Sequence, residues 1–381
     1  MLQFVVFEFL CRGVIKKHYI NFEDFFMNQE QNLDELRLEV VKKIENLQKR
    51  EASCGELNSE FIKLGFESTN AFKHLIARVR KTDSGDVKKT LLGAKQAVDK
   101  LLLKHVAFNN KRAYFYDVSI NNLTKIYENL QKENQFFLLG ESHKNFNYDE
   151  IDHEKIETSL IFDDNDFKVV YLKTGRNRVE TRFIADGADL FEQEHGKVVE
   201  VRIKVQYEMN AFDFIAFDFK NEKLIIGADL NKLFPKPETE KAIDRLQIAV
   251  RKLAGLQELK NRNLRNCVEN LELEESGIVL NHAFMTAEGG YNHAGNSITN
   301  KQDVRKDDFH ADGIKDKEAD YYGIIKAYEL SDEETVVITI RMTFRDYKKL
   351  NLPIRFAILD GVTSLNGLKF AIRKVIEHNH N

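Results

Sequence analysis

KVVEVRIKVQY, residues 197–207, alternates apolar and polar side chains from Val199 to Tyr207. Valine, isoleucine and tyrosine occupy the odd positions from 199 to 207, and charged or amide side chains occupy the even positions between them. A period of two residues predicts a strand, because successive side chains of an extended chain point to opposite faces. One apolar and one polar face is typical of an antiparallel sheet that packs on one side only.

Segments on both sides of this stretch also predict strands. DFIAFDF at 213–219 and KLIIGADL at 223–230 are joined by Asn221–Glu222 and predict a hairpin, and later strands are expected at 335–345 and 354–360. Four earlier segments are rich in the aromatic and β-branched residues that favour strands. They are RAYFYDV (112–118), NQFFLLG (134–140), KVVYLKT (168–174) and RVETRFI (178–184).

The N-terminal part has a helical pattern instead. Apolar residues recur three and four positions apart from Leu33 to Leu47, which makes one apolar stripe. Two further helices are predicted at about 58–81 and 86–106, separated by a turn at Thr82–Gly85. Residues 1–26 precede the first helix and are interpreted as a possible accessory extension.

These patterns predict an α+β fold. We expect a helical N-terminal domain, followed by a mixed, largely antiparallel sheet body with a long connecting helix. Pro235 and Pro237 are two of only three prolines and mark a boundary before that helix. The predicted regions are a helical domain at 1–108, a β-rich α+β region at 109–235, a long helix or helical hairpin at 236–275, and a C-terminal α+β region at 276–381 that contains a long loop at 280–323 and ends in a helix at 364–378.

The connecting helix is expected to pack against its own chain. Ile243, Leu246, Val250 and Leu253 keep heptad spacing, but the polar residues further along the helix interrupt the seam. A dimeric coiled coil needs three or four sustained heptads, which this segment does not supply. The oligomeric state is left open by this pattern.

Composition indicates a folded protein and argues against several other classes. A hydrophobic fraction of 43% in 381 residues fills ordinary cores, and a net charge of −4 on 118 charged residues argues against a general polyanion binder. Three widely spaced cysteines offer no disulfide framework and indicate a reducing compartment. With no apolar run of membrane-spanning length, we expect a soluble, cytoplasmic protein. The Lys-, Asn- and Phe-rich, Trp-free chain suggests a bacterial or phage origin.

The stretch 280–323 has no apolar period and is interpreted as a long exposed loop. It contains His282, His293 and His310 together with acidic residues such as Asp308, and these four are the candidate catalytic residues. Imidazole and carboxylate groups would hold a divalent metal if the fold brought them together, although their spacing matches no local metal motif. A partner-binding loop and a substrate-gating lid are the alternatives.

Local basic surfaces are the candidate nucleic-acid contacts. Lys173, Arg176 and Arg178 lie beside Gly175, where a hairpin turn would expose them to phosphates. In the third predicted helix, the lysines opposite the apolar stripe, among them Lys88 and Lys95, form a second basic surface. Solvated helix and sheet faces of ordinary charge are the alternative interpretation of both.

Strand geometry argues against a nuclease motif in this chain. Asp213 with Asp218 and Lys220 has the residue types of a metal-dependent nuclease site, but a spacing of five places the two acids on opposite faces of a strand. A weaker variant combines Asp186 and Asp189 with Glu200, and Arg202 takes the place of the lysine. Gly140–His143 brings Glu, Ser and His together, and it is interpreted as a turn because adjacent side chains diverge.

The sequence is therefore interpreted as an interaction protein whose partner is a nucleic acid or another protein, with no membrane partner. An antiphage or mobile-element role suits such a chain. The alternative is a metal-dependent hydrolase or nuclease with its site on the 280–323 loop.

Overall fold

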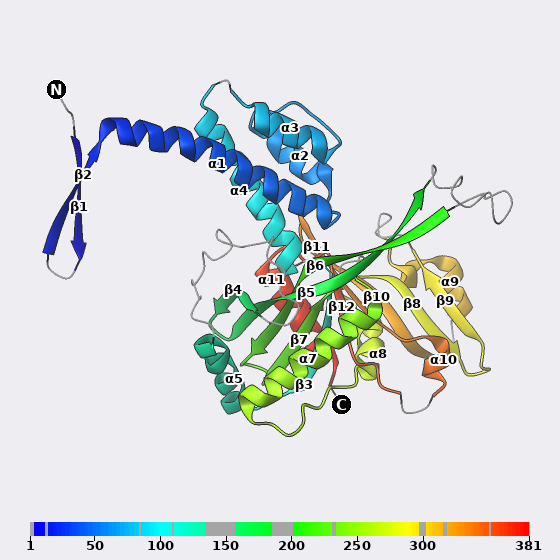
Figure 1. Cartoon of the computed structure of the whole chain (residues 1–381). Coiled ribbons are helices and arrows are strands. Elements are labelled where there is room, and N and C mark those ends of the chain that lie inside the picture. The colour runs from blue at the N-terminus through cyan, green and yellow to red at the C-terminus, as the bar shows by residue number, and fades with distance from the viewer. Residues whose placement is uncertain are drawn as a thin grey trace, which may run out of the picture. The chain divides into compact units, whose positions relative to one another are not determined.

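The structure is a computed structural model that describes residues 4–11, 14–83, 85–108, 110–133, 157–184, 201–230, 234–296, 302–314, 318–349 and 352–380. The chain divides into two compact units, residues 1–105 and 106–381. Helices combine with a ten-stranded antiparallel sheet, so the predicted α+β class is confirmed (Figure 1).

The first unit is built from helices and one hairpin. Its strands are β1 (Phe4–Cys11) and β2 (Val14–Asn21), which pair antiparallel. Its helices are α1 (Phe22–Lys49), α2 (Cys54–Lys63), α3 (Phe72–Lys81) and α4 (Val87–Leu103), and the π-helical turn η1 (Lys104–Phe108) follows.

Two expectations about these helices need correction. The first helix starts at Phe22, inside the proposed extension. The helix predicted at 58–81 is two helices, because the chain turns at Gly65, whose φ of 89° ends the helical path. The apolar stripe of α1 is buried as its spacing predicts, with Val40, Ile44 and Leu47 fully inaccessible.

The second unit is organised around one sheet. Its strand order is β4-β5-β6-β7-β3-β12-β11-β10-β8-β9, and every described pair is antiparallel. The strands are β3 (Lys111–Asp117), β4 (Glu157–Asp164), β5 (Phe167–Ile184), β6 (Val201–Asp218), β7 (Lys223–Asp229), β8 (Ile278–Thr286), β9 (Tyr291–Gly295), β10 (Ala319–Ser331), β11 (Glu334–Arg341) and β12 (Ala357–Asp360).

The predicted hairpin at 213–230 is confirmed, since β6 and β7 pair from Asp218↔Lys223 onward. Glu222 has a positive φ of 53°, as expected for a tight turn. Strands from both the 109–235 and the 276–381 regions enter the sheet, so these predicted regions share one structural core.

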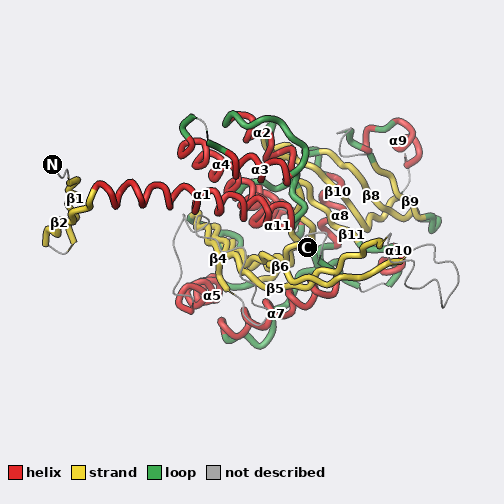
Figure 2. The backbone as a smooth tube through the Cα atoms, turned by 45° about the horizontal axis from the view of Figure 1, so that its top comes forward, coloured by secondary structure: helices red, strands yellow, loops and turns green. Residues whose placement is uncertain are grey.

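Helices cover both faces of this sheet (Figure 2). Helices α5 (Ile120–Glu133) and α7 (Lys236–Ala254) pack on one face, where Tyr114, Ile226 and Ile215 are cross-strand neighbours in a buried cluster. The remaining helices are α8 (Arg265–Leu273), α9 (Asp308–Ile314), α10 (Phe344–Tyr347), α11 (Leu365–His378) and the 3-10 turn η4 (Val304–Lys306).

Helix α8 lies on the opposite face. The Lys326 ammonium on β10 donates to the Leu271 carbonyl of α8, 2.7 Å away. A row of cross-strand partners runs from β10 to β3 through Lys326, Ile338, Leu359 and Lys111. These side chains therefore share one face of the sheet. Because Lys111 and Tyr114 are three residues apart on one strand, they point to opposite faces.

The segment 236–275 is two helices rather than one. Gly255 follows α7 with φ 70° and ψ 30°, a left-handed conformation that glycine adopts without strain and that ends a helix. Ile243, Leu246 and Val250 are buried against the sheet. No helix in the described parts of the chain is long and apolar enough to cross a membrane.

Three expectations fall on residues outside the described ranges. They are the strand at 134–140, the turn at 140–143 and the first four residues of the stretch 197–207; the acids of the weaker nuclease variant, Asp186, Asp189 and Glu200, also lie outside these ranges.

Candidate functional site

Strands β5 and β6 continue together beyond the rest of the sheet (Figure 1). They pair from Phe167↔Asp218 to Ile184↔Val201, whereas β4 pairs with β5 only up to Lys173. Across the described strands, residues 177–184 and 201–208 therefore pair only with each other. We call these two segments the ribbon. At the usual rise per residue, its eight residues per strand measure about 26 Å.

The root of the ribbon is held by a buried ion pair. Arg176 and Asp213 are both fully inaccessible and form a salt bridge. Arg176 Nη1 donates to the Asp229 carbonyl over 2.8 Å, and the Asp229 amide donates to Asp213 Oδ1 over 2.8 Å. Since a buried charge is stable only when it is paired, this contact fixes the strands where they leave the sheet.

This arrangement corrects the expected hairpin turn at Gly175. Residues 167–184 form one continuous strand, so Gly175 lies within it. Lys173 is also buried, and Arg176 is committed to Asp213. Burial leaves neither side chain accessible to a phosphate, and Arg178, two residues further along the strand, is only partly exposed.

Further along the ribbon, one face carries exposed cations beside an exposed aromatic ring. Arg202 pairs with Phe183 and Lys204 with Thr181, and all four side chains are exposed. Phe183 is 67% exposed, and the Arg202 guanidinium lies 5.2 Å from the centre of its ring. This cation–π contact orients the guanidinium over the ring.

The sequence contained a signal for this face, although it pointed to Arg202 only through the weaker nuclease variant and to Lys204 in no candidate site. The even positions of the stretch 197–207 include Arg202 and Lys204, and strand alternation already placed them on the polar side. Phe183 could not be identified in this way, because its exposure depends on none of the described strands pairing with the outer edge of the ribbon.

The lysines of α4, in the first unit, differ from one another in environment. Lys88 is exposed near the start of the helix. Lys95 is half-buried and forms an ion pair with Glu39 over 2.7 Å. Glu39 also pairs with Lys43, whose ammonium lies 2.5 Å from the carboxylate of Asp99. Of the two candidate lysines on α4, Lys95 is therefore neutralised within the unit.

The stretch 280–323 is not a free loop, which corrects the sequence interpretation. It contains β9, most of β8, the turn η4, helix α9 and the start of β10. His282 is fully buried on β8, whereas His293 is exposed on β9. Asp308 is exposed at the start of α9, and His310 lies in the same helix, where its side chain is outside the described set.

Register shows that two of the candidate histidines diverge. His293 is the cross-strand partner of Ala283, and Ala294 is the partner of His282. His282 and His293 therefore point to opposite faces of the sheet. In the parts of the chain that the structure describes, no three His, Cys, Asp or Glu residues gather in a way that could hold a metal ion.

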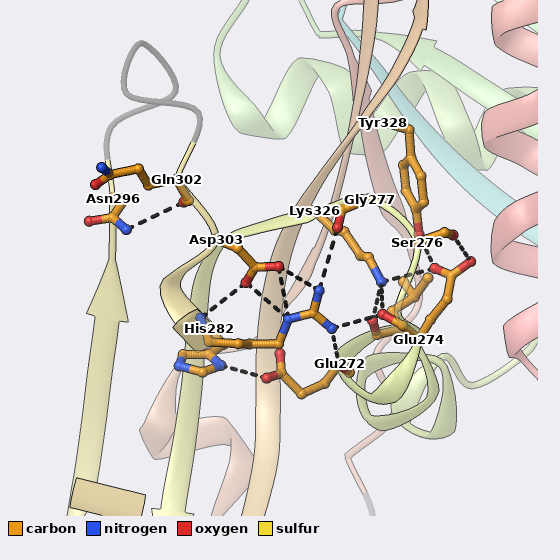
Figure 3. A network of polar contacts seen from close by, with 12 residues as sticks. Glu272, Glu274, Ser276, Gly277, His282, Asn296, Gln302, Asp303, Lys326 and Tyr328 are labelled. Atoms are coloured by element: carbon orange, nitrogen blue, oxygen red, sulfur yellow. Dashed lines mark hydrogen bonds and ion pairs between the residues drawn. The ribbon is translucent and has the colours of Figure 1, made fainter. Parts of the chain in front are cut away.

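A polar network surrounds His282 (Figure 3). Its Nδ1 lies 3.0 Å from Glu272 Oε1, and its ring packs against Phe284 and Tyr321. Close by, Arg305 binds Asp303 through two nitrogens and donates to the carbonyls of Glu272 and Glu274, each over 2.7 Å. These carbonyls belong to the end of α8, so the guanidinium satisfies groups that the helix leaves unbonded.

Glu274 is the second centre of this network. Lys326, Tyr328 and Lys374 donate to its carboxylate over 2.9, 2.6 and 2.6 Å. Burial raises the pKa of Glu274, but the hydrogen bonds from Lys374, Ser276, Tyr328 and Lys326 outweigh it and hold the pKa well below its usual range. The carboxylate stays ionised and joins α8 to β10 and α11, which is a structural arrangement.

The two acids of the nuclease pattern, Asp213 and Asp218, lie on β6 but contact different cations. Asp213 binds Arg176 at the ribbon root, whereas Asp218 accepts two hydrogen bonds from Arg373 of α11, each over 3.1 Å. Both acids are therefore used by internal cations. No protein-family model matches this chain, and a comparison with curated proteins finds no significant match.

Proposed function

We propose that this protein binds nucleic acid and that the β5–β6 ribbon is its contact surface. The observation that carries the proposal is the exposed face on which Arg202, Lys204 and Phe183 stand together, on strands that pair only with each other there among those described. Such a ribbon presents cations and an aromatic ring away from the packed sheet.

The shape of the ribbon suits a nucleic-acid groove. The major groove of B-DNA, about 12 Å wide, admits a two-stranded β-ribbon. A length of about 26 Å at the usual strand rise corresponds to most of one helical turn, which is about 34 Å long. The ribbon could therefore follow a groove while its cations face the phosphates.

Charge supports the same partner. The ribbon contains four arginine or lysine residues and two glutamates, a net charge of +2 on a chain whose total is −4. A local excess of cations gives an electrostatic attraction to phosphates that does not depend on base sequence. Phe183 adds a flat apolar surface that can stack on a base or enter a base step.

The proposal includes a bacterial, cytoplasmic protein, for which DNA and RNA are accessible partners. A role in antiphage defence or in a mobile element follows as an extension of this proposal, since foreign nucleic acid is what such a system must recognise.

Binding of a labelled duplex at several salt concentrations tests the proposal. Replacing Arg202 and Lys204 with alanine should make the slope of log K against log salt shallower by about 1.8, if each cation neutralises one phosphate. The matched control replaces Lys132 and Lys236, both 72% exposed on helices, and should leave the slope unchanged. No binding by the unaltered protein at low salt, or equal effects of the two double variants, would contradict the ribbon as the contact surface.

A further inference from the structure

A second aromatic surface lies outside the ribbon, where β9 meets α10. The ring of Tyr291 on β9 stacks on Phe344 of α10, with centroids 4.5 Å apart and planes 28° apart. Phe344 in turn contacts Tyr322, which contacts Tyr347 at 5.0 Å. Four rings thus form a continuous series from the interior to the surface.

The inner rings hold the outer one in place. Tyr322 and Tyr347 are buried in a small cluster with Ala283, whereas Tyr291 is 65% exposed. Phe344 covers one face of the Tyr291 ring, and a ring supported in this way presents its other face as a rigid, flat surface. Exposed aromatic side chains of this kind are enriched at binding sites.

A cation contacts this aromatic series, and others are close to it in sequence. The ammonium of Lys348 lies 4.5 Å from the centre of the Phe344 ring. Arg341 and Arg345 are exposed next to it in sequence, and Lys349 pairs with Asp346 over 3.0 Å. Residues 341–349 contain four arginine or lysine residues and one aspartate, so their net charge is +3.

We propose that Tyr291 is a stacking site for an unpaired nucleobase, with the cations of residues 341–349 contacting the phosphates beside that base. The inference rests on the proposed function and adds the class of substrate, because a base can stack on Tyr291 only when it is free of a duplex. Aromatic platforms beside cations bind single strands with little sequence preference, since every base has a π-face.

An acidic peptide would satisfy the cations but would gain little from the flat ring. The aromatic stack therefore favours a base over a run of carboxylates, and the two ligands can be separated by competition.

The absence of tryptophan from this chain makes a direct test available. Tyr291→Trp keeps a stacking ring and introduces a single tryptophan, which can be excited separately from the tyrosines, and Phe183→Trp does the same on the ribbon. A homopyrimidine single strand should quench the Tyr291→Trp fluorescence, a blunt duplex should not, and polyglutamate should not compete.

Affinity measurements complete the test. Tyr291→Leu should weaken single-strand binding at least about fivefold, while Tyr291→Phe keeps it, because a stacked base contributes about 1 kcal/mol or more. Unchanged affinity of Tyr291→Leu, equal weakening of duplex binding, or displacement by polyglutamate would overturn the stacking site. If any of these results is obtained while nucleic acid still quenches the Phe183→Trp fluorescence, the stacking site is wrong but the ribbon proposal is retained. If the unaltered protein binds neither the single strand nor the duplex, the proposed function itself is wrong.

Discussion

At the scale of single residues, burial separates His282 from His293. His282 is fully inaccessible and contacts Glu272, which is itself buried, so its removal would leave a carboxylate without that partner. Replacing His282 with alanine should lower the free energy of unfolding by about 1–3 kcal/mol, as measured by denaturant titration. His293→Ala, on an exposed side chain, should change it by less than about 0.5 kcal/mol. Equal effects of the two variants would contradict this assignment.

Burial also distinguishes Arg176, which is inaccessible at the root of the ribbon, from Arg202, which is exposed further along it. Replacing Arg176 with alanine leaves Asp213 charged and buried, which should cost about 3–5 kcal/mol of stability. Replacing Arg202 should alter stability by less than about 0.5 kcal/mol while weakening nucleic-acid binding. Thermal and denaturant unfolding of both variants check this. An Arg176 variant as stable as the unaltered protein would show that the root of the ribbon does not depend on this ion pair.

At the scale of elements, α11 is tied to the turn between β4 and β5 by charge. Lys369 and Arg373 bind Asp166 over 2.9 and 2.8 Å, and these hydrogen bonds lower the pKa of Asp166 to about 2. A carboxyl whose pKa is lowered on folding stabilises the folded state above its unfolded pKa of about 3.9, and this contribution is lost as the pH falls towards 2.

Comparison with Asp166→Asn isolates this contribution. At neutral pH the variant should be less stable by about 1 kcal/mol, a value reduced for solvent screening because the carboxylate is 38% exposed. The difference should disappear between about pH 4 and pH 2. Unfolding titrations across this range measure it, and a difference that persists at pH 2 would exclude the ion pairs as its source.

Elements with a clear apolar period could be predicted from the sequence. The 213–230 hairpin and the last helix, which runs from Leu365 to His378, are confirmed close to their expected bounds. Periodicity reports which face of an element is buried, and that information is local.

The candidate sites could not be predicted in the same way. Gly175 resembles a turn in sequence, but inside β5 it only follows the strand path. His282 resembles a ligand in a polar loop, yet Glu272 and the sheet bury it. Strand β9, YNHAG, consists mainly of Asn, His, Ala and Gly, so its strand character comes from pairing with β8 rather than from propensity.

At the scale of the whole molecule, one short strand joins the two halves of the sheet. Strand β12 has four residues and lies between β3 and β11. It pairs with β3 through Ala113↔Ala357 and with β11 through Ile338↔Leu359. Replacing Ile358 with proline removes a donor from a central strand. Hydrogen exchange should then show lost protection in β3 and β11 as well as in β12; loss confined to β12 would contradict this role.

The position of β12 also sets an order of events during synthesis. Every other strand of the sheet precedes it in the chain, so two half-sheets can form on the ribosome but cannot join until the last residues have emerged. Until then β3 and β11 each present an unpaired edge, the kind of surface through which nascent chains aggregate. A premature stop shortly before residue 357 should therefore produce an insoluble chain instead of a partly active one, and chaperone demand should peak at the very end of translation.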